Sequence, residues 1–486
     1  MNTILVHELI FNRSFIWNYL LVAGTKLTFF GGVNEIGGNK ILLEDKDTRI
    51  FLDFGMNFTR MGLYFEEFIK PRTCNGILDF LTMGLIPEIE SVYRKDLLEW
   101  AGMKIHEKPL VDGLVLSHAH LDHASHISFI DGDVPIYCSE ITHVILRVLH
   151  EIESRSIDGE IIDFKLRPIL NSKNKAISRT FSLGNKFKIN GLEIEMFPVD
   201  HSIPGACGMI IYTSDKTIAY SGDLRLHGTD GHLTEEFVNK VKLARPDIFL
   251  CEGTRINNNE QHGEENVKLN SNKGVSDTKG MVIADYVWKD TTRFKTFLEI
   301  ARENNRKLCI SFREAYYIRE LKKFIKNLPD LNDPSILLYK RKIKTGTYRE
   351  NDYMDVEREF LNFENTVDAS YVHKNQDEVI MELAYWHIPE LIDLKPSAGS
   401  LYIKSASEAF TEEQIFDMKR LRRWLDFFHL NYVNFHASGH APAQDLKKVM
   451  EGSEAKIIIP IHTEHQELFG PLIKNSIRIE LPNPSY

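Results

Sequence analysis

The sequence has few cysteines, no long apolar run and no excess of basic residues, and each of these absences excludes a class of protein. The five cysteines are Cys74, Cys138, Cys207, Cys251 and Cys309. They are odd in number and form no C-x-x-C pair, which argues against a disulfide framework and favours a reducing compartment. No stretch approaches the roughly 20 consecutive apolar residues of a spanning helix. We therefore expect a cytoplasmic protein with no membrane partner.

The charge balance is acidic. The chain has 59 Lys and Arg against 69 Asp and Glu, a formal net charge of -10 and a pI near 6.0. This excludes a protein that is coated in basic surface, so nucleic acid would have to be bound in a local groove. A length of 486 residues, with 43% hydrophobic and 26% charged content, predicts two or three globular units.

The first residues contain one apolar stretch, "FIWNYLLVAG" at 15–24. It is short and includes Asn18, so a secretory signal is the weaker interpretation. We treat residues 1–25 as a leader of uncertain role, either an extra strand or a mis-assigned start.

Short apolar runs alternate with helical patterns along the chain, which is typical of an α/β protein. One helix is predicted after Asp290 and another after Ser139, each of which is a good N-terminal cap. The segment 255–280 is rich in Asn and Gly and poor in apolar residues. We expect a mobile loop or linker there, and it is the best candidate domain boundary.

Six predicted strands end in residues that can bind metal or act in catalysis. These residues are Asp53, the run His118 to His123, His201, Asp223, Glu252 and His462. In sheets that are flanked by helices, ligand-binding groups gather at the carboxyl ends of the strands. We therefore expect these six segments to meet in one site.

The run "HAHLDH" at 118–123 supplies imidazoles and a carboxylate within one loop. Neutral imidazole and carboxylate are the ligands that zinc prefers. Strand-like alternation would point His118, His120 and Asp122 to the same side. Two zinc ions roughly 3.5 to 4 Å apart would need about three protein ligands each and one shared carboxylate, and would activate a water between them.

Together with Asp53, His201 and Asp223, the "HAHLDH" motif resembles the metallo-β-lactamase superfamily. The resemblance implies that one zinc is bound by His118, His120 and His201 and the other by Asp122, His123 and His462. Asp223 would lie between the two ions, and Asp53 would lie behind the ligands. Flavodiiron relatives carry Glu where His120 stands, so zinc is favoured here, with manganese as the alternative.

Three later motifs narrow the resemblance to the β-CASP family. They are "CEGTR" at 251–255, "HASGHAP" at 436–442 and "IIPIHTEH" at 458–465. From Lys26 onward the chain is similar to ribonuclease J and its short archaeal relatives. This implies an αββα metallo-β-lactamase sandwich, residues 26–253 and 436–486, with an inserted β-CASP α/β domain, residues 254–435.

The resemblance also assigns roles to the later motifs. Glu252 would hold a protonated His440, which donates to the departing ribose oxygen, while Asp122 serves the metal-activated water. His436, Ser438 and Gly439 would bind a phosphate of single-stranded RNA. The implied activity is RNA hydrolysis, 5' to 3' exonucleolytic and with endonuclease activity as an addition.

Several alternatives stay open. An endonuclease of the cleavage-factor type, a small-molecule metallohydrolase and a non-catalytic RNA-binding scaffold are the other functions. Only 24 residues follow His462, so we expect no C-terminal dimerisation domain of the bacterial type, and a homodimer is undecided. The run "YKRKIKTGTYR" at 339–349 is either part of an RNA channel or a solvated basic loop.

Overall fold

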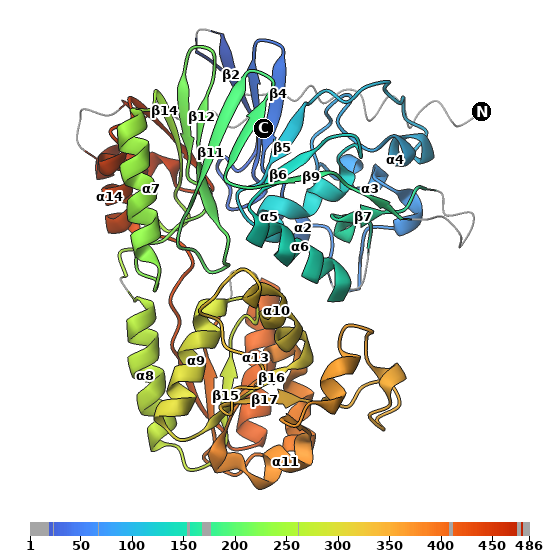
Figure 1. Cartoon of the computed structure of the whole chain (residues 1–486), viewed down its shortest axis with the longest axis vertical. Coiled ribbons are helices and arrows are strands. Elements are labelled where there is room, and N and C mark those ends of the chain that lie inside the picture. Colours follow the sequence, from blue (N-terminus) through green and yellow to red (C-terminus); the bar gives the residue numbers. More distant parts are fainter. Residues whose placement is uncertain are drawn as a thin grey trace.

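Three seven-stranded sheets form the molecule (Figure 1). The computed structural model describes residues 19–22, 24–66, 68–152, 156–167, 176–260, 262–407, 412–473 and 478–479. Two sheets lie in the upper part of Figure 1 and the third lies in the lower part. Most of the predicted leader falls outside the described residues, but Tyr19–Val22 form a strand.

The first two sheets draw on both ends of the chain. The first contains, in spatial order, β1 (Tyr19–Val22), β2 (Thr25–Gly31), β3 (Lys40–Asp45), β4 (Thr48–Leu52), β5 (Gly113–Val115), β6 (Ile136–Cys138) and β9 (Phe181–Leu183). The second contains β10 (Lys186–Ile189), β11 (Leu192–Pro198), β12 (Cys207–Tyr212), β13 (Thr217–Tyr220), β14 (Ile248–Glu252), β22 (Ile457–Ile461) and β23 (Arg478–Ile479). A separate small ladder joins β7 (Asp163–Phe164) and β8 (Ile177–Ser178).

These two sheets pack face to face. Leu43 and Ile50 of the first sheet share one buried cluster with Ile194 and Met209 of the second. Helix α6 (Glu140–Ile152) covers the outer face of the first sheet, and α7 (Gly231–Ala244) and α14 (Ala443–Ser453) cover that of the second. The layers are therefore helix, sheet, sheet, helix, and the predicted αββα fold class is confirmed. Shorter helices are α2 (Phe58–Gly62), α3 (Leu78–Thr82), α4 (Lys95–Trp100), α5 (Leu121–Ala124) and α15 (Phe469–Leu472).

The third sheet is parallel throughout, and helices cover both of its faces. Its order is β18 (Thr366–Val367), β17 (Ile336–Tyr339), β16 (Lys307–Ser311), β19 (Val379–Glu382), β15 (Val282–Asp285), β20 (Leu401–Lys404) and β21 (Asn431–Asn434). Its helices are α8 (Glu264–Asp277), α9 (Thr291–Glu303), α10 (Phe312–Lys322), α11 (Ala369–Lys374), α12 (Leu391–Leu394) and α13 (Glu412–Phe427). All strand carboxyl ends therefore meet at one edge.

Both predicted caps are present. The Asp290 carboxylate accepts the backbone N–H groups of Thr292 and Arg293 at the start of α9, and Ser139 Oγ accepts that of Thr142 at the start of α6. The linker predicted at 255–280 is wrong for most of its length, because α8 occupies Glu264–Asp277. Its buried residues Val267, Ser271 and Val275 recur every four positions, as one helical stripe requires.

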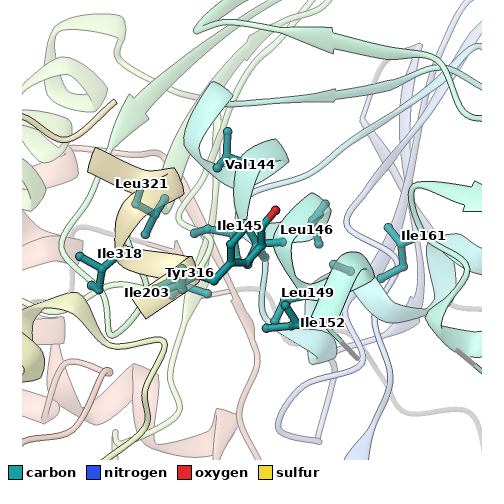
Figure 2. Packing of buried hydrophobic residues seen from close by; sticks show 14 of the residues in the cluster. Val144, Ile145, Leu146, Leu149, Ile152, Ile161, Ile203, Tyr316, Ile318 and Leu321 are labelled. Atoms are coloured by element: carbon teal, nitrogen blue, oxygen red, sulfur yellow. The ribbon is translucent and has the colours of Figure 1, made fainter. Parts of the chain in front are cut away.

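Helix α10 of the third sheet packs directly on α6 of the sandwich. Figure 2 shows Ile145 and Leu149 of α6 close to Tyr316 and Leu321 of α10, within one buried cluster. An ion pair of 2.8 Å between Arg147 and Glu320 spans the same contact. This packing holds the third sheet against the sandwich.

Within the described residues, no helix is both long and apolar enough to cross a membrane.

Candidate metal centre

The "HAHLDH" loop leads from a central strand into a short helix. Strand β5 is buried, and His120 takes the N-terminal position of α5. His118 and His123 are fully buried. The extended chain therefore ends at His120, and the predicted strand-like alternation does not continue to Asp122, because a helical turn begins at Leu121.

Two glycines allow the backbone to close around Asp122. A Cβ atom at Gly37 would lie 2.8 Å from Asp122 Cβ, and one at Gly55 would lie 1.8 Å from the Asp122 carbonyl oxygen. Gly37 also has a φ of +75°, which side chains other than glycine rarely adopt. Gly37 and Gly55 thus admit the close approach of Asp122.

The first cluster of potential ligands contains His118, His120, His201 and Asp223. His120 Nδ1 lies 3.2 Å from His118 Nε2 and 3.0 Å from His201 Nε2. The Asp223 Oδ2 atom is 3.6 Å from His118 Nε2 and 3.8 Å from His201 Nε2. Three ring nitrogens and one carboxylate oxygen therefore face a common point.

The second cluster contains Asp122, His123, Asp223 and His462. His462 Nε2 lies 3.2 Å from Asp122 Oδ2, and His123 Nε2 lies 3.1 Å from Asp223 Oδ2. Asp223 belongs to both clusters through the same oxygen, Oδ2. The structure therefore brings together all seven residues that the sequence nominates as ligands, in two sets with one shared carboxylate.

The donor set suits a cation. The Asp223 Oδ1 atom is buried and has no hydrogen-bond partner among the described residues. Burial lowers the pKa of His118 and His201 well below the ordinary value and that of His120 to about 4, so these rings are neutral and can donate a lone pair. Five imidazoles and two carboxylates form a nitrogen and oxygen set of the kind that zinc binds.

Asp53 lies behind the clusters rather than in them. Its carboxylate accepts the backbone N–H and the hydroxyl of Ser117, each at 2.7 Å, and its Oδ2 lies 2.7 Å from His123 Nδ1. The buried Tyr220 hydroxyl donates to the same oxygen at 2.5 Å. These contacts orient the His123 ring, as carboxylates behind metal-binding histidines do.

Two other rings are oriented by groups to which the sequence analysis assigns no such role: Gly439 is expected there to bind phosphate, and Thr254 is not singled out. The His201 Nδ1 atom lies 2.6 Å from the Gly439 carbonyl oxygen, and His462 Nδ1 lies 2.8 Å from the Thr254 hydroxyl. The same hydroxyl donates to Glu252 at 2.8 Å. Thr254 stands inside the "CEGTR" motif, but nothing in the sequence gives its partner 208 residues away.

Glu252 and His440 form an ion pair beside both clusters. His440 Nδ1 lies 3.4 Å from Glu252 Oε1 and 3.9 Å from Asp223 Oδ2. Burial lowers the pKa of His440, but the carboxylates of Glu252 and Asp223 outweigh it and raise the pKa to about 9. With this pKa the His440 ring is charged at neutral pH. Its side chain is 21% exposed, so it is accessible from outside.

The residues proposed for phosphate binding lie on the same loop. His436 Nδ1 is 3.4 Å from the Ser405 carbonyl oxygen, and the Ser438 hydroxyl accepts the His440 backbone N–H at 3.2 Å. A Cβ atom at Gly439 would lie 2.5 Å from Ser202 Oγ, so only glycine fits there. Two other histidines close to these motifs in the sequence lie apart from the clusters: His126 is buried against Phe80 and Phe129, and the His465 side chain is 40% exposed.

Comparison with known families matches two parts of the chain. Residues 94–282 match the family described as "Beta-lactamase superfamily domain", and residues 430–470 match "Zn-dependent metallo-hydrolase RNA specificity domain". Together these ranges contain all seven nominated ligands and His440.

Similar proteins cover nearly the whole chain. Ribonuclease J of Mycoplasma pneumoniae is 24% identical over 91% of this chain and 68% of its own length. Ribonuclease J of Mycoplasma genitalium is 25% identical over 90% and 68%, and that of Thermus thermophilus is 24% identical over 92% and 70%.

A solved structure supports the fold. A protein of unknown function from Enterococcus faecalis superposes with a TM-score of 0.72 at 23% identity, over 96% of this chain and 99% of that one. The likeness extends through the third sheet as well as the sandwich, since nearly all of each chain is covered. Two parts of the chain are therefore similar to the β-lactamase superfamily domain and to the Zn-dependent metallo-hydrolase RNA specificity domain, and most of the chain is similar to ribonuclease J.

Proposed function

We propose that the protein is a zinc-dependent ribonuclease of the ribonuclease J type, which hydrolyses RNA phosphodiesters and acts mainly as a 5' to 3' exonuclease. The proposal rests on the arrangement of the ligand clusters and the neighbouring ion pair. Two ligand clusters that share Asp223 lie directly beside the Glu252 and His440 ion pair. The similarity to ribonuclease J and the match to an RNA specificity domain support RNA as the substrate.

Two zinc ions are proposed as the cofactor, with manganese as the alternative. One would be held by His118, His120 and His201, the other by Asp122, His123 and His462, with Asp223 between them. When bound, the ions supply Lewis-acid activation of water and stabilise negative charge on the phosphate. Asp53, Thr254 and the Gly439 carbonyl fix the ring orientations that this arrangement requires.

His440 is the proposed proton donor. Glu252 accepts hydrogen bonds from the Thr254 backbone N–H at 2.9 Å and from the Thr254 hydroxyl, so its carboxylate is fixed in place. It faces His440 Nδ1, which leaves Nε2 to donate to the departing ribose oxygen. A raised pKa keeps the proton on the ring until the bond breaks.

The motif loop at 436–439 is the proposed binding site for the 5'-phosphate. Burial lowers the pKa of His436 to about 3, so the ring is neutral and would act as a hydrogen-bond donor rather than a charge. The Ser438 hydroxyl and the backbone beside Gly439 would supply further donors. A phosphate held there would position the first phosphodiester at the metals and so cause exonucleolytic cleavage.

The division into domains is part of the proposal. Residues 26–253 and 436–486 would form the metallo-β-lactamase domain, and 254–435 the β-CASP domain that covers it.

A cytoplasmic location is also proposed. All five cysteines lie in the described residues as free thiols, and four of them are buried: Cys138, Cys207, Cys251 and Cys309; Cys74 is exposed. Free thiols support a reducing, cytoplasmic setting.

The test is a time course on single-stranded RNA that is labelled at its 3' end and carries a 5'-monophosphate or a 5'-hydroxyl. We expect progressively 5'-shortened products with zinc-loaded protein, faster formation with the monophosphate, and no product with Asp122→Ala. Internal fragments that ignore the 5' group would instead establish an endonuclease. Intact RNA with the wild type would overturn the proposal and return attention to a small-molecule hydrolase or a scaffold.

A further inference from the structure

The carboxyl edge of the third sheet carries a group of basic and aromatic side chains, which we call the basic edge. Trp288 and Lys289 follow β15, Arg313 follows β16, Arg341 follows β17 and His387 follows β19. Because every strand of this sheet is parallel, these residues converge from separate parts of the sequence. Ligands of open parallel sheets bind at this edge.

Trp288 lies at the centre of the basic edge. Its indole is half-buried, with Lys289 Nζ at 5.8 Å and Arg313 Cζ at 5.9 Å from the ring centroid. The ring of Tyr317 meets the indole edge-on at 5.2 Å and 85°, and the Tyr317 hydroxyl donates to the Lys289 carbonyl oxygen at 2.9 Å. Tyr317 therefore fixes the indole and leaves the cations beside its face.

The basic edge lies next to the metal centre. The Asp285 carbonyl oxygen at the end of β15 accepts the Ser405 backbone N–H at 2.7 Å, and the Ser405 carbonyl oxygen lies 3.4 Å from His436 Nδ1, in the loop that carries His440. Arg313 stands in the first turn of α10, the helix that packs on α6 of the sandwich. Burial lowers the pKa of His387 to about 4, and the charges of Arg341 and Arg313 add to that effect, so the His387 ring is neutral beside two guanidinium groups.

The neighbouring basic loop contributes less. Lys342 pairs with Asp393 at 3.0 Å, and Lys344 donates to the Asn351 carbonyl oxygen. Lys340 lies over the ring of Tyr348 at 4.8 Å. The run at 339–349 is therefore mostly engaged with its own surroundings, and only Arg341 reaches the basic edge.

We propose that Trp288 stacks a nucleobase of the RNA strand close to the scissile phosphate, with Arg313 over the same base and Lys289 and Arg341 on the adjoining phosphates. The inference rests on the proposed ribonuclease function and names the side chains that would bind its single-stranded RNA substrate, because a base within a duplex presents no free face. Aromatic stacking combined with cationic contacts to the backbone tolerates any base. The subsite would therefore select strandedness and not sequence.

The experiment measures RNA binding by fluorescence anisotropy in a His440→Ala background, with gel analysis to show that the RNA stays intact. A short 5'-monophosphorylated RNA carries one abasic nucleotide, which is moved along the strand. We expect one abasic position to weaken binding roughly 5- to 150-fold, the range of stacking on one aromatic side chain. Trp288→Ala should weaken binding of the unmodified RNA by a similar factor and lose nothing further at that position.

Trp288→Phe and Trp424→Ala are the controls. Trp288→Phe keeps an aromatic face and should recover part of the loss. Trp424 is also half-buried and stacked on an aromatic ring, but α13 carries it to the opposite edge of the sheet, just before β21, so Trp424→Ala should bind as the parent does. The stacking site would be overturned if Trp288→Ala bound the unmodified RNA as tightly as the parent does. It would also be overturned if the losses from Trp288→Ala and from the abasic nucleotide added up at every position of that nucleotide. Wild-type protein that neither binds nor cleaves RNA would overturn the proposed function first.

Discussion

His462 Nε2 lies 3.2 Å from Asp122 Oδ2, although 340 residues separate the two in the sequence. His462 follows β22 of the second sheet, and Asp122 lies in α5 after β5 of the first sheet. The second ligand cluster therefore closes only when the two sheets pack face to face. Metal binding at this cluster must then be coupled to folding of the sandwich.

The first prediction concerns metal content and stability. Asp223→Ala removes the one carboxylate that both clusters share, so we expect the bound zinc to fall from two ions toward none. Zinc at 100 times its dissociation constant should stabilise the wild type by about 2.7 kcal/mol over the chelated protein, and this gain should vanish in the variant. Elemental analysis and thermal unfolding measure both effects.

The control for this prediction is Asp355→Ala, which removes an aspartate whose side chain is 87% exposed. It should bind zinc and respond to chelation as the wild type does. Retention of two ions by Asp223→Ala would contradict the shared role of that carboxylate.

The second prediction separates chemistry from binding. His440→Ala should lower kcat by roughly 10²- to 10⁴-fold, the usual contribution of a general acid, while the dissociation constant for RNA stays unchanged. His465→Ala is the matched control, because its side chain is 40% exposed and pairs only with Glu467 among the described residues. A weaker affinity with an unchanged kcat would make His440 a binding residue instead.

The third prediction tests Thr254, which joins His462 to Glu252 through one hydroxyl. Thr254→Val keeps the shape and removes both contacts. Loss of a group that orients a metal ligand typically costs 10- to 100-fold in metal affinity or activity, and we expect a loss in that range by zinc competition titration. Thr254→Ser keeps the hydroxyl and should restore most of it; equal defects in both variants would point to packing instead.

The strand-end residues could be predicted because they combine a short-range signal with a general rule. Asp53, His201, Asp223 and His462 each follow an apolar run, and the topology of α/β sheets brings such ends together. The residue pattern alone does not say which ligands share an ion; that assignment comes from the resemblance to the metallo-β-lactamase superfamily. Asp122 lies in the cluster of His462 and not in that of His118, and the short helix α5 that carries it accepts the backbone N–H groups of Gly38 and Met56; neither contact leaves a local signal in the sequence.

Helix α8 was missed for a related reason. Its apolar residues are few, so its periodicity is weak, and its Asn and Gly content favours loops. The helix is held by tertiary packing: its stripe of Val267, Ser271 and Val275 is buried, and on its exposed side Lys268 and Asn272 contact Glu299 and Glu303 of α9. Such long-range partners leave no local signal in the sequence.

The fourth prediction concerns the buried pair of arginines that meets at Glu264. Arg225 of the sandwich and Arg293 of α9 are both fully buried and contact the Glu264 carboxylate at 3.2 and 2.9 Å. Arg225 also donates to the Ser438 carbonyl oxygen. Arg225 keeps Asp200 at 2.9 Å, but Glu264→Ala leaves the buried Arg293 without its carboxylate partner and should cost about 3 to 5 kcal/mol of the free energy of unfolding.

Urea unfolding checks this value, and Glu265→Ala, the exposed neighbour on the same turn, should change it little. Zinc binding should persist in both variants, since neither residue belongs to a ligand cluster. A stability equal to that of the wild type would show that the arginines find other partners.

The fifth prediction is a pH dependence of stability that comes from Glu382, far from the ligands in the sequence. Burial raises the pKa of this carboxyl group from its ordinary value of 4.5 to about 7, although hydrogen bonds from Ser311 oppose the shift. Burial also raises the pKa of its neighbour Glu314 well above the ordinary value, and the charge of Glu382 adds to that effect. Both groups are therefore costly to ionise in the folded protein.

The direction in which the free energy of unfolding changes with pH follows from proton binding. Because the folded protein holds the Glu382 proton more tightly than the unfolded chain, the free energy of unfolding falls as pH rises from 4.5 to about 7. The full fall is roughly 3 kcal/mol, since each pKa unit corresponds to about 1.4 kcal/mol. Glu382→Gln cannot ionise, so the difference in stability between variant and wild type should move in favour of the variant by about this amount. Denaturant unfolding at pH 5 and pH 8 measures this change. Glu378→Gln, at an exposed position, is the control, and its free energy of unfolding should differ little from that of the wild type at either pH. A difference between Glu382→Gln and the wild type that does not change with pH would contradict the buried, protonated state.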